Sequence, residues 1–421
     1  MPVLSVTDVA DGLAFAAAAV YGHPAFSLDI VGLTGTNGKT TTTHLVRAAI
    51  DGAVGKETCG IVGTIGHSFA GRTIEALHTT PEADELARIL AVMKKRGATS
   101  AAMEVSSIAL VTGRVRAVRF RVAAFTNFTQ DHLDFHGTME AYAAAKMSLF
   151  VEMAPGLAVV NVDDALGERI ANAARCQVLR VRTRVGAGSG DIVPERIEAD
   201  PSGMRVTVRI GERKLEIATR LVGLHNVENL LVALGVVHAL ELDLGRAAQA
   251  LASELGAPGR LERCDGPQDD IVVLVDYAHT PDALARVLDA VIAVRGKGRV
   301  ICVFGCGGDR DPTKREPMGD AVGRRADLAV VTSDNPRSED PAAIAAPVTR
   351  AARAANHAHV EVELDRKRAI AKAVTEAAPG DIVLLAGKGH EPYQIVGTEK
   401  RALDDRVEAR AALASRRGRR T

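Results

Sequence analysis

Short apolar runs of strand length recur along the chain, with helical patterns between them. In the first half these runs cover residues 28–33, 61–64, 100–105, 122–126 and 157–162. A helical pattern follows the first run over residues 44–50, and another precedes it over residues 6–20, ended by Gly22 and Pro24. Strands that alternate with helices are typical of an α/β fold built on a parallel sheet.

The period changes between residues 192 and 222. Residues 204–210 alternate strictly between apolar and polar side chains, which favours antiparallel strands. Helical patterns return over residues 227–240 and 245–255. The polar, turn-rich stretch 265–270 then predicts a domain boundary.

A second α/β unit is predicted beyond this boundary. Its strands cover residues 271–275, 299–304, 328–332 and 381–385. Each is followed by polar or glycine-rich residues, which are 276–279, 305–310, 333–337 and 387–391. Because parallel sheets bind ligands beyond the carboxyl ends of their strands, we expect a ligand-binding rim there.

A glycine turn joins the first strand to its helix and carries the most specific motif. The turn is Gly35-Thr36-Asn37-Gly38, and Lys39, Thr40 and Thr41 follow it. Its spacing is shorter than the standard G-x-x-x-x-G-K-[ST], because residue 33 is leucine. Strand, glycine turn, Lys-Thr and helix still predict a phosphate loop, with Lys39 on the terminal phosphates and Thr40 on Mg²⁺. An ordinary strand-to-helix turn is the alternative.

Composition limits the class of partner. The 421 residues include 52 basic and 52 acidic side chains, so the formal net charge is zero, which argues against nucleic acid or a membrane as partner. No apolar run has membrane length, and residues 1–4 lack the charged start of a secretion signal. Five cysteines without metal-like spacing favour a reduced, cytoplasmic setting. Cys302 and Cys306 are predicted to be buried thiols. We expect the basic residues 416–420 to form a frayed tail.

Acidic and imidazole side chains follow the next two strands. Glu104 ends one strand, where a carboxylate could complete the Mg²⁺ shell that Thr40 begins. Asp131, His132 and Asp134 lie in the loop after the following strand. Taken alone, such residues are usually solvated or cap a helix. Their position after a phosphate loop favours a site.

Lys146 lies on the apolar stripe of a helical pattern, with Met139, Tyr142, Ala143 and Phe150. A lysine on this stripe either extends its amine to solvent or serves a site. An amine beside a metal centre can instead take up CO₂ and become a carbamate, and the sequence leaves these alternatives open.

Together these motifs resemble the Mur ligase family, whose members form amide bonds at the expense of ATP in peptidoglycan synthesis. In family order they are Gly35–Thr40, His78-Thr79-Thr80-Pro81, Glu104-Val105-Ser106-Ser107, Asp131-His132-Leu133-Asp134, Asn226 with Asn229, Gly259-Arg260, Asp276-Tyr277-Ala278-His279, 305–310, Asp334-Asn335-Pro336-Arg337 and 387–391. Within the family, the chain is most similar to members that add meso-diaminopimelate to UDP-N-acetylmuramoyl-L-alanyl-D-glutamate. The resemblance implies a P-loop-type parallel-sheet ATPase domain (residues 28–264) after a leading helix (1–27), and then a Rossmann-like α/β domain (265–421).

The resemblance also assigns roles to single residues. It implies catalysis by Lys39, Glu104, His132 and a carbamylated Lys146, and metal binding by Thr40, Glu104, His132 and Lys146. ATP would be held by residues 35–41, Asn226, Asn229, Arg260 and Asp276. Thr79, Thr80, Ser106 and Arg114 would contact the muramyl dipeptide. Arg310, Asp334, Asn335, Pro336, Arg337, Gly387 and Glu391 would bind the amino acid. The implied cofactors are ATP and Mg²⁺, the partners are small molecules, and the enzyme is a cytoplasmic monomer whose carboxy-terminal domain moves about a hinge near Asp265.

Some features depart from the family pattern. Relatives carry a uridine-binding amino-terminal domain, of which only the leading helix is expected here, so the chain is either short or begins inside a longer reading frame. Ile108 and Thr112 stand where relatives often carry histidine and glutamine. Two other hypotheses therefore stay open: a ligase for a carboxylate without a UDP tag, and a pseudo-ligase that binds nucleotide and docks to a partner.

Overall fold

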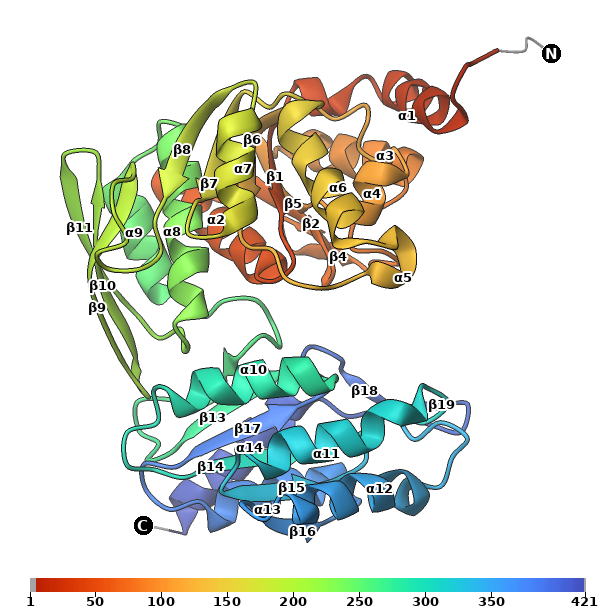
Figure 1. Cartoon of the computed structure of the whole chain (residues 1–421), viewed down its shortest axis with the longest axis vertical. Coiled ribbons are helices and arrows are strands. Elements are labelled where there is room, and N and C mark those ends of the chain that lie inside the picture. Colours follow the sequence, from red (N-terminus) through yellow and green to blue (C-terminus); the bar gives the residue numbers. More distant parts are fainter. Residues whose placement is uncertain (1–4, 420–421) are drawn as a thin grey trace. The chain divides into compact units, whose positions relative to one another are not determined.

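The structure is a computed structural model, and it describes residues 5–419. The chain forms two compact units, each described here by itself (Figure 1). Unit 1 contains the residues up to Glu198 together with Arg205–Thr219 and His225–Glu254. Unit 2 contains Ala199–Met204, Arg220–Leu224 and the chain from Leu255 onward. The boundary predicted at residue 265 lies inside unit 2 of this division.

Unit 1 is organised around a large sheet, in which the described residues form eleven strands in the order β11-β10-β9-β8-β7-β6-β1-β5-β2-β3-β4. The strands are β1 (Asp29–Thr34), β2 (Cys59–Gly63), β3 (Gly66–Phe69), β4 (Arg72–Ile74), β5 (Ser100–Glu104), β6 (Phe120–Phe125), β7 (Leu157–Asn161), β8 (Gln177–Val181), β9 (Ile192–Asp200), β10 (Gly203–Ile210) and β11 (Arg213–Thr219). β1 lies between β5 and β6 and is parallel to both. The ends of these three strands therefore meet at one edge, and that edge carries the predicted phosphate loop.

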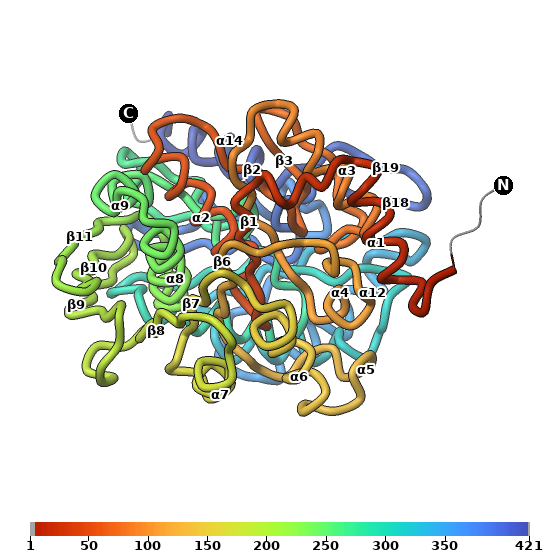
Figure 2. Tube along the Cα trace, turned by 90° about the horizontal axis from the view of Figure 1, so that it is seen from above, coloured from red at the N-terminus to blue at the C-terminus, as the bar shows by residue number. Residues whose placement is uncertain are grey.

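Helices cover both faces of this sheet. They are α1 (Val9–Val20), η1 (Pro24–Phe26), α2 (Lys39–Val54), α3 (Ala83–Lys95), α4 (Ser107–Val111), α5 (Leu133–His136), α6 (Met139–Val151), α7 (Ala165–Ala173), α8 (His225–Ala239) and α9 (Leu244–Ser253). Apolar residues of α3, α6 and α7 share one core with Ile30, Met103 and Phe125 of the strands. Helices α8 and α9 pack against α2 (Figure 2). The central strands β1, β5 and β6 are buried along almost their whole length, as their apolar sequences predict, whereas β4, β9 and β11 keep exposed residues.

Unit 2 has a second sheet, in the order β12-β13-β17-β14-β15-β16 for the described residues. Its strands are β12 (Glu262–Arg263), β13 (Val272–Asp276), β14 (Val300–Phe304), β15 (Leu328–Val331), β16 (His359–Val362) and β17 (Ile382–Ala386), and β18 (Tyr393–Val396) pairs with β19 (Glu399–Ala402). β13, β17, β14, β15 and β16 pair in parallel, whereas β12 pairs antiparallel with β13. The four predicted polar segments thus follow parallel strands at one edge, as expected, and the binding of a ligand at this rim stays a prediction.

Alternate residues of these strands belong to two separate hydrophobic cores. Leu274, Cys302 and Leu384 pack on one side with α10 (Pro281–Ile292), α11 (Arg315–Gly323) and α12 (Pro341–Ala354). Val273, Val303 and Leu385 pack on the other side with α13 (Arg366–Glu376) and α14 (Asp405–Gly418). A short helix, η2 (Pro312–Lys314), precedes α11. Both units are therefore α/β, as the sequence predicts.

Most predicted elements are confirmed, and the differences have local causes. The predicted leading helix is α1, and the alternating stretch 204–210 lies within β10. Strand β2 was predicted, but β3 and β4, which extend it as hairpins, and the β18–β19 hairpin were missed, because strands of three to four residues give too short a pattern. Cys302 and Cys306 are buried as predicted.

The predicted frayed tail is wrong over the residues described. α14 continues to Gly418, and the Arg416 guanidinium donates two hydrogen bonds to Asp270, at 2.9 and 2.8 Å. Arg417 also pairs with Asp269, at 2.6 Å. Residues 1–4 and 420, to which the signal and tail predictions also refer, lie outside the described residues.

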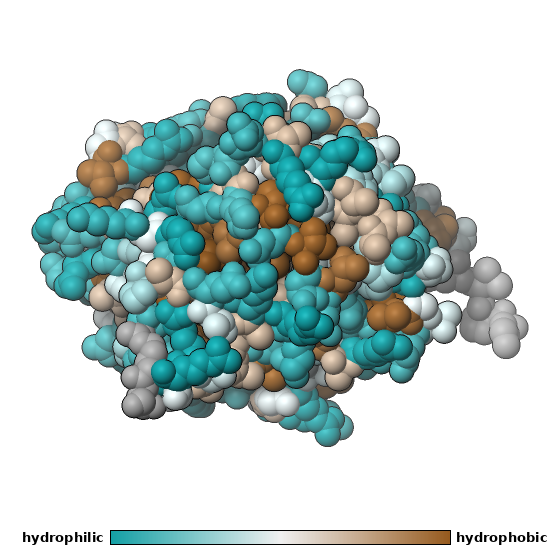
Figure 3. Space-filling model, turned by 90° about the horizontal axis from the view of Figure 1, so that it is seen from below, coloured by the Kyte–Doolittle hydropathy of each residue, from teal (hydrophilic) through white to brown (hydrophobic). Residues whose placement is uncertain are grey.

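The view in Figure 3 is mostly hydrophilic, with a hydrophobic patch near its centre. Among residues 5–419, no helix is both long enough and apolar enough to cross a membrane.

Candidate active site

The phosphate loop of unit 1 is fixed by the residues that follow the neighbouring strand β6. The Thr36 amide donates to the Asn127 carbonyl at 2.7 Å, and the Asn37 amide donates to Asn127 Oδ1 at 2.9 Å. The Thr126 hydroxyl donates to the Asn37 carbonyl at 2.7 Å. Because these bonds hold the loop in place, its backbone can be preorganised for an anion.

Gly38 is required by both its backbone and its neighbours. Its φ is +83°, in the region that favours glycine, and it directly precedes α2. A Cβ placed there would lie 2.4 Å from Asn229 Oδ1, which also accepts from the Thr42 hydroxyl at 3.0 Å. Any side chain at this position would therefore displace Asn229 and the start of α2.

We expect Gly38→Ala to weaken ATP binding by at least about tenfold, because strain and the Asn229 clash would together cost more than roughly 1.4 kcal/mol. The matched control is Gly71→Ala. Gly71 has a similar φ of +72° and no atom within 4 Å of its hypothetical Cβ, so that variant carries the strain without the clash. Calorimetric titration with ATP tests this, and equal affinities in the two variants would contradict it.

Two lysine amines converge on the same carbonyl of the loop. Lys39 Nζ donates to Gly35 O at 2.9 Å and to Thr36 O at 3.0 Å, and Lys146 Nζ donates to Gly35 O at 2.7 Å. Lys146 is 1% exposed, so its amine does not extend to solvent. Burial, and then the charge of Lys39, lowers the pKa of Lys146 well below its ordinary value. Of the alternatives left open by the sequence, the geometry favours a lysine that serves the site.

Tyr142 lies about one turn before Lys146 on α6 and contacts its amine. Its ring lies 4.5 Å from Lys146 Nζ, and its hydroxyl is 3.2 Å from Thr36 Oγ1 in the loop. Burial raises the pKa of Tyr142 to about 12, so the phenol stays neutral. The sequence pattern placed this tyrosine only on an apolar stripe and did not indicate its contact with the loop.

Glu104 is buried at the end of β5 and collects three donors. Its carboxylate accepts from the Thr40 hydroxyl at 2.9 Å, the Thr64 amide at 2.8 Å and the Thr64 hydroxyl at 3.1 Å. The structure thus places Thr40 and Glu104, two of the predicted metal ligands, in direct contact.

His132, a third predicted ligand, is more exposed. Its side chain is 42% exposed, its Nε2 lies 3.6 Å from Asp131 Oδ2, and its ring meets the Tyr142 ring at 6.0 Å. The Tyr142 ring therefore lies next to both His132 and Lys146. Among the described residues, no hydrogen bond joins His132 to Glu104. His136, which the sequence did not assign, bonds Ser107 Oγ at 2.9 Å.

The residues predicted to contact the muramyl dipeptide gather beside Glu104. Thr80 Oγ1 donates to the Glu104 carbonyl at 2.9 Å and accepts from the Ser106 amide at 3.0 Å. Arg114 donates to the Thr80 carbonyl at 3.0 Å, and the hydroxyls of Thr79 and Thr64 are 3.1 Å apart. These four residues come together although 35 positions separate the first from the last.

Asn226 and Asn229, predicted to hold the nucleotide, lie in the first turns of α8. Both are 2% exposed, and Asn229 Nδ2 donates to Asn226 Oδ1 at 2.9 Å. Because Asn229 also contacts Thr42, the pair supports the phosphate loop from behind.

Unit 2 carries the remaining predicted nucleotide residues. The Asp276 carboxylate accepts from the Leu261 and Ala278 amides, each at 2.8 Å. Burial raises the pKa of Asp276, and the nearby Arg260 opposes this shift. The Arg260 guanidinium lies 4.8 Å from the centre of the Tyr277 ring. These contacts leave a cation and a carboxylate together at the end of β13.

The predicted amino-acid pocket is built from the ends of β15 and β17. Asn335 Nδ2 donates to Glu391 Oε2 at 3.1 Å, and Asn335 Oδ1 accepts from the Ile395 amide at 2.9 Å. Lys388, which the sequence did not assign, is fully buried and bonds both Asn335 Oδ1 and Glu391 Oε2 at 3.2 Å. Asp334 is also close, since a Cβ on Gly387 would lie 2.7 Å from its Oδ2.

Two arginines, Arg337 and Arg310, follow strands on the same rim. Arg337 has a left-handed φ of +51° and donates from its guanidinium to the Gly308 carbonyl at 2.7 Å. Pro336 approaches Gly308 so closely that a Cβ there would meet its carbonyl at 2.0 Å. Arg310, on the same rim, is exposed. The structure thus brings the predicted amino-acid residues together, with Arg310 at the surface.

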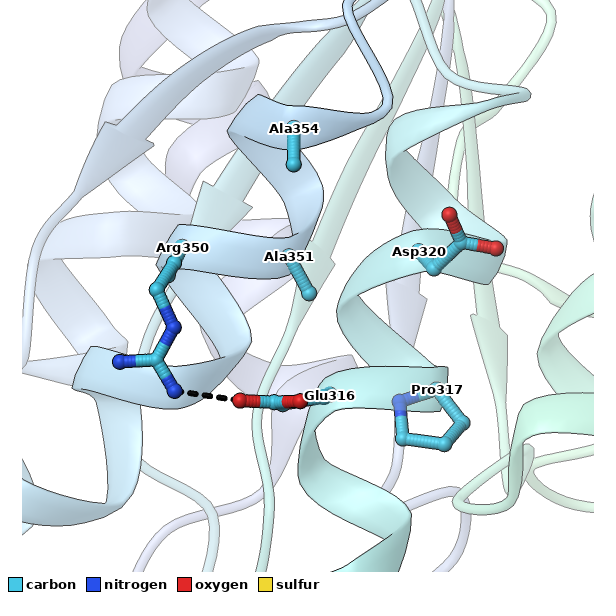
Figure 4. A pocket seen from close by; sticks show the side chains of 6 residues that line it. All are labelled: Glu316, Pro317, Asp320, Arg350, Ala351 and Ala354. Carbon is cyan, nitrogen blue, oxygen red and sulfur yellow. Dashed lines mark hydrogen bonds and ion pairs between the residues drawn. The ribbon is translucent and has the colours of Figure 1, made fainter.

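A further depression lies between α11 and α12 (Figure 4). Glu316 and Arg350 form an ion pair across it, and its other lining residues are Pro317, Asp320, Ala351 and Ala354. None of the predicted site residues lines it, so the candidate site is not there.

Two known protein families match this chain, one over most of unit 1 and the other over most of unit 2. The family "Mur ligase middle domain" matches residues 33–237, and "Mur ligase, glutamate ligase domain" matches residues 259–389. The chain belongs to the Mur ligase family. Members of this family use ATP and Mg²⁺.

Relatives of this Mur ligase cover nearly the whole chain. A UDP-N-acetylmuramoyl-L-alanyl-D-glutamate–2,6-diaminopimelate ligase from Gloeobacter violaceus is 48% identical over 100% of this chain and 84% of its own length. The enzyme of that name from Streptomyces coelicolor is 45% identical over 99% of this chain and 82% of its own.

Solved structures of related enzymes also match most of this chain. A structure of a UDP-N-acetylmuramoyl-L-alanyl-D-glutamate–2,6-diaminopimelate ligase matches with a TM-score of 0.71 and 34% identity, over 93% of this chain and 79% of the other. A Mycobacterium tuberculosis folylpolyglutamate synthase matches with a TM-score of 0.67 but 19% identity, over 90% of this chain and 92% of the other, and so shares the fold.

The residues of this Mur ligase fit a magnesium ion beside ATP. Mg²⁺ prefers oxygen ligands and is usually held by one or two protein groups together with substrate phosphates. The Thr40 hydroxyl and the Glu104 carboxylate supply such oxygens next to the phosphate loop. Among the described residues no group of three or more histidine, cysteine or carboxylate side chains could hold a metal alone.

Proposed function

We propose that this Mur ligase joins meso-diaminopimelate to UDP-N-acetylmuramoyl-L-alanyl-D-glutamate with the conversion of ATP to ADP and phosphate, in peptidoglycan precursor synthesis. The observation that carries the proposal is the convergence of Lys39 and Lys146 on the phosphate loop, next to the Thr40–Glu104 contact. The names of relatives that are 48% and 45% identical support the choice of substrates.

In the first step, an oxygen of the D-glutamyl side-chain carboxylate attacks the γ-phosphorus of ATP and the bond to ADP breaks. An anion that approaches a polyphosphate is repelled, so positive charge must be present before the bond forms. Lys39 would supply this charge at the terminal phosphates, and the loop amides would orient them. When bound, Mg²⁺ would neutralise further phosphate charge, held by Thr40, Glu104 and His132.

In the second step, an amine of diaminopimelate attacks the acyl phosphate, and a tetrahedral intermediate expels phosphate to leave the amide. Glu391 would hold the distal ammonium of the amino acid, and Arg337 its distal carboxylate, because a guanidinium pairs bidentately with a carboxylate. Asp334, Asn335 and Gly387 would shape the pocket. Lys39 belongs to unit 1 and Arg337 to unit 2, so the proposal assigns ATP activation and amino-acid binding to different units.

Lys146 would act as a carbamate in this mechanism. Its lowered pKa favours the neutral amine that reacts with CO₂, and the product would place an anionic oxygen pair beside the loop. Thr79, Thr80, Ser106 and Arg114 would hold the dipeptide, while Asn226, Asn229, Arg260 and Asp276 would hold the nucleotide. A monomeric, cytoplasmic enzyme is part of the same proposal.

The test is an assay of ADP release with ATP, Mg²⁺, the muramyl dipeptide nucleotide and meso-diaminopimelate, with the product identified by mass spectrometry. We expect ADP and the tripeptide nucleotide in equal amounts, and neither without the dipeptide. A parallel reaction contains the acyl dipeptide without its UDP group. Turnover of only this second substrate would favour a ligase outside cell-wall synthesis, and no substrate-dependent ADP in either reaction would reject the proposal.

A further inference from the structure

Unit 2 contains a completely buried ion pair that the proposed mechanism does not use. Arg366 and Asp405 have 0% exposed side chains, and the guanidinium donates to both carboxylate oxygens, from Nε at 2.8 Å and from Nη2 at 2.6 Å. Removing two charges from water is costly, and apolar residues of similar size often replace such a pair without loss of stability. The pair therefore needs an explanation beyond the stability of the core.

Helix stability does not supply that explanation for Arg366. Arg366 is the first residue of α13 and Asp405 is the first residue of α14. An aspartate is favoured at a helix N-terminus, whereas a cation is disfavoured there. Asp365 and Asp404 already cap the two helices, by accepting from the amides of Arg368 and Arg406.

The other donors of Arg366 reach two strand ends. Nη2 donates to the carbonyl of Ala386, the last residue of β17, at 2.9 Å. Nη1 makes a longer contact of 3.5 Å with the carbonyl of Ser333, just after β15. The next residues in the chain are Gly387 and Asp334, both in the amino-acid pocket. One guanidinium therefore contacts the backbone carbonyls directly before two residues of the pocket.

The first turn of α14 also contacts the loop that follows β17. Arg406 pairs with Asp404 at 2.6 Å and donates to the carbonyl of His390 at 3.4 Å. His390 directly precedes Glu391. The start of α14 is therefore held against the loop that carries the proposed ammonium ligand.

We propose that Arg366 and Asp405 are positioning residues for the amino-acid pocket. Asp405 fixes the orientation of the Arg366 guanidinium, and Arg366 fixes the carbonyls of Ser333 and Ala386, so that Asp334 and Gly387 keep the spacing that binding requires. The pair touches no substrate. The inference rests on the proposed function, because it takes that pocket to be the seat of the incoming amine.

The experiment uses the full chain and compares four variants. Arg366→Met breaks the pair, and the double variant Arg366→Met with Asp405→Leu removes both charges, so that no buried charge is left unpaired. Arg366→Lys keeps the charge and loses the fork. The control is Arg299→Met, because Arg299 pairs with the buried Asp381 just before β17, at the opposite end of that strand.

We expect the double variant to raise KM for meso-diaminopimelate at least tenfold, with KM for ATP within twofold of the wild type, and Arg366→Lys to show part of this effect. Arg299→Met should leave both constants within twofold. A purely structural role would lower the melting temperature and the fraction of active enzyme without separating the two KM values. A folded double variant with an unchanged KM for diaminopimelate would overturn the inference.

Hydrogen–deuterium exchange separates this inference from the proposed function. In the double variant, or in Arg366→Lys if the double variant does not fold, we expect faster exchange in residues 333–338 and 386–391 and not in residues 299–304. If the wild type shows no ligase activity, the proposed function fails while this measurement still decides the positioning role. Unchanged exchange in both loops would contradict it.

Discussion

Replacing Lys146 by methionine should lower kcat about 10²–10³-fold, the usual effect of removing one preorganised charge or donor from a transition state. The Lys146 amine is buried and bonds Gly35 O, which also accepts from Lys39, so Lys39 is already engaged at the loop and Lys146→Met removes the only residue that the proposal assigns to the carbamate. The fold should survive, because methionine is apolar and of similar length. Steady-state kinetics with a circular-dichroism check of folding gives the answer. A variant with wild-type kcat would remove Lys146 from the mechanism.

The same variant should change the pH dependence of stability in a defined direction. The folded pKa of Lys146 lies below its unfolded value, so the unfolded chain binds more protons between the two values. The free energy of unfolding contributed by this lysine therefore rises with pH across that window and is lowest below the folded pKa. Lys146→Met should lose this rise, and its gain over the wild type should be largest at low pH. Urea titrations across the pH range measure it, provided CO₂ is excluded, since a carbamate would stabilise the neutral side of the equilibrium.

Replacing Arg337 by alanine should lower kcat/KM for meso-diaminopimelate roughly 100-fold, because losing one partner of a buried charge pair costs about 3 kcal/mol. The KM for ATP should stay unchanged. L-Lysine has no distal carboxylate, so we expect the wild type to use it poorly and the substitution to change its turnover little. The variant should therefore lose most of the preference for diaminopimelate over lysine.

The control for this prediction is Arg324→Ala, which removes an exposed ion pair with Asp320 at 2.8 Å. Exposed pairs contribute about 1 kcal/mol or less, so this variant should resemble the wild type. Competition between the two amino acids, with both products quantified in one reaction, measures the preference directly. An unchanged preference in Arg337→Ala would show that another group selects the distal carboxylate.

The phosphate loop could be predicted because all its information is local. An apolar strand, a glycine turn and the start of a helix follow one another within residues 28–50, and Gly38 does adopt the left-handed φ that such a turn requires. The rim of unit 2 could be predicted for a similar reason. Parallel strands place their carboxyl ends at one edge, whichever order the strands take.

Contacts between distant residues could not be predicted in this way. Lys146 lies 111 positions from its acceptor Gly35, so its helix periodicity indicated only that it faces inward. The tail prediction failed for the same reason, because Arg416 finds Asp270 across 146 positions. Lys388 and Arg366 were missed since burial of a charge depends on partners that spacing does not reveal. An arginine at the first position of a predicted helix is the one local signal that could have marked Arg366.

The measurement that tests the central claim most directly follows the oxygen atoms of the carboxylate. The D-glutamyl side chain of the muramyl dipeptide nucleotide is labelled with ¹⁸O at both carboxylate oxygens, and the reaction is run with unlabelled ATP, Mg²⁺ and meso-diaminopimelate. Activation as an acyl phosphate predicts one ¹⁸O atom in each phosphate released and one in the new amide. Phosphate without the label, formed together with the tripeptide, would contradict the account.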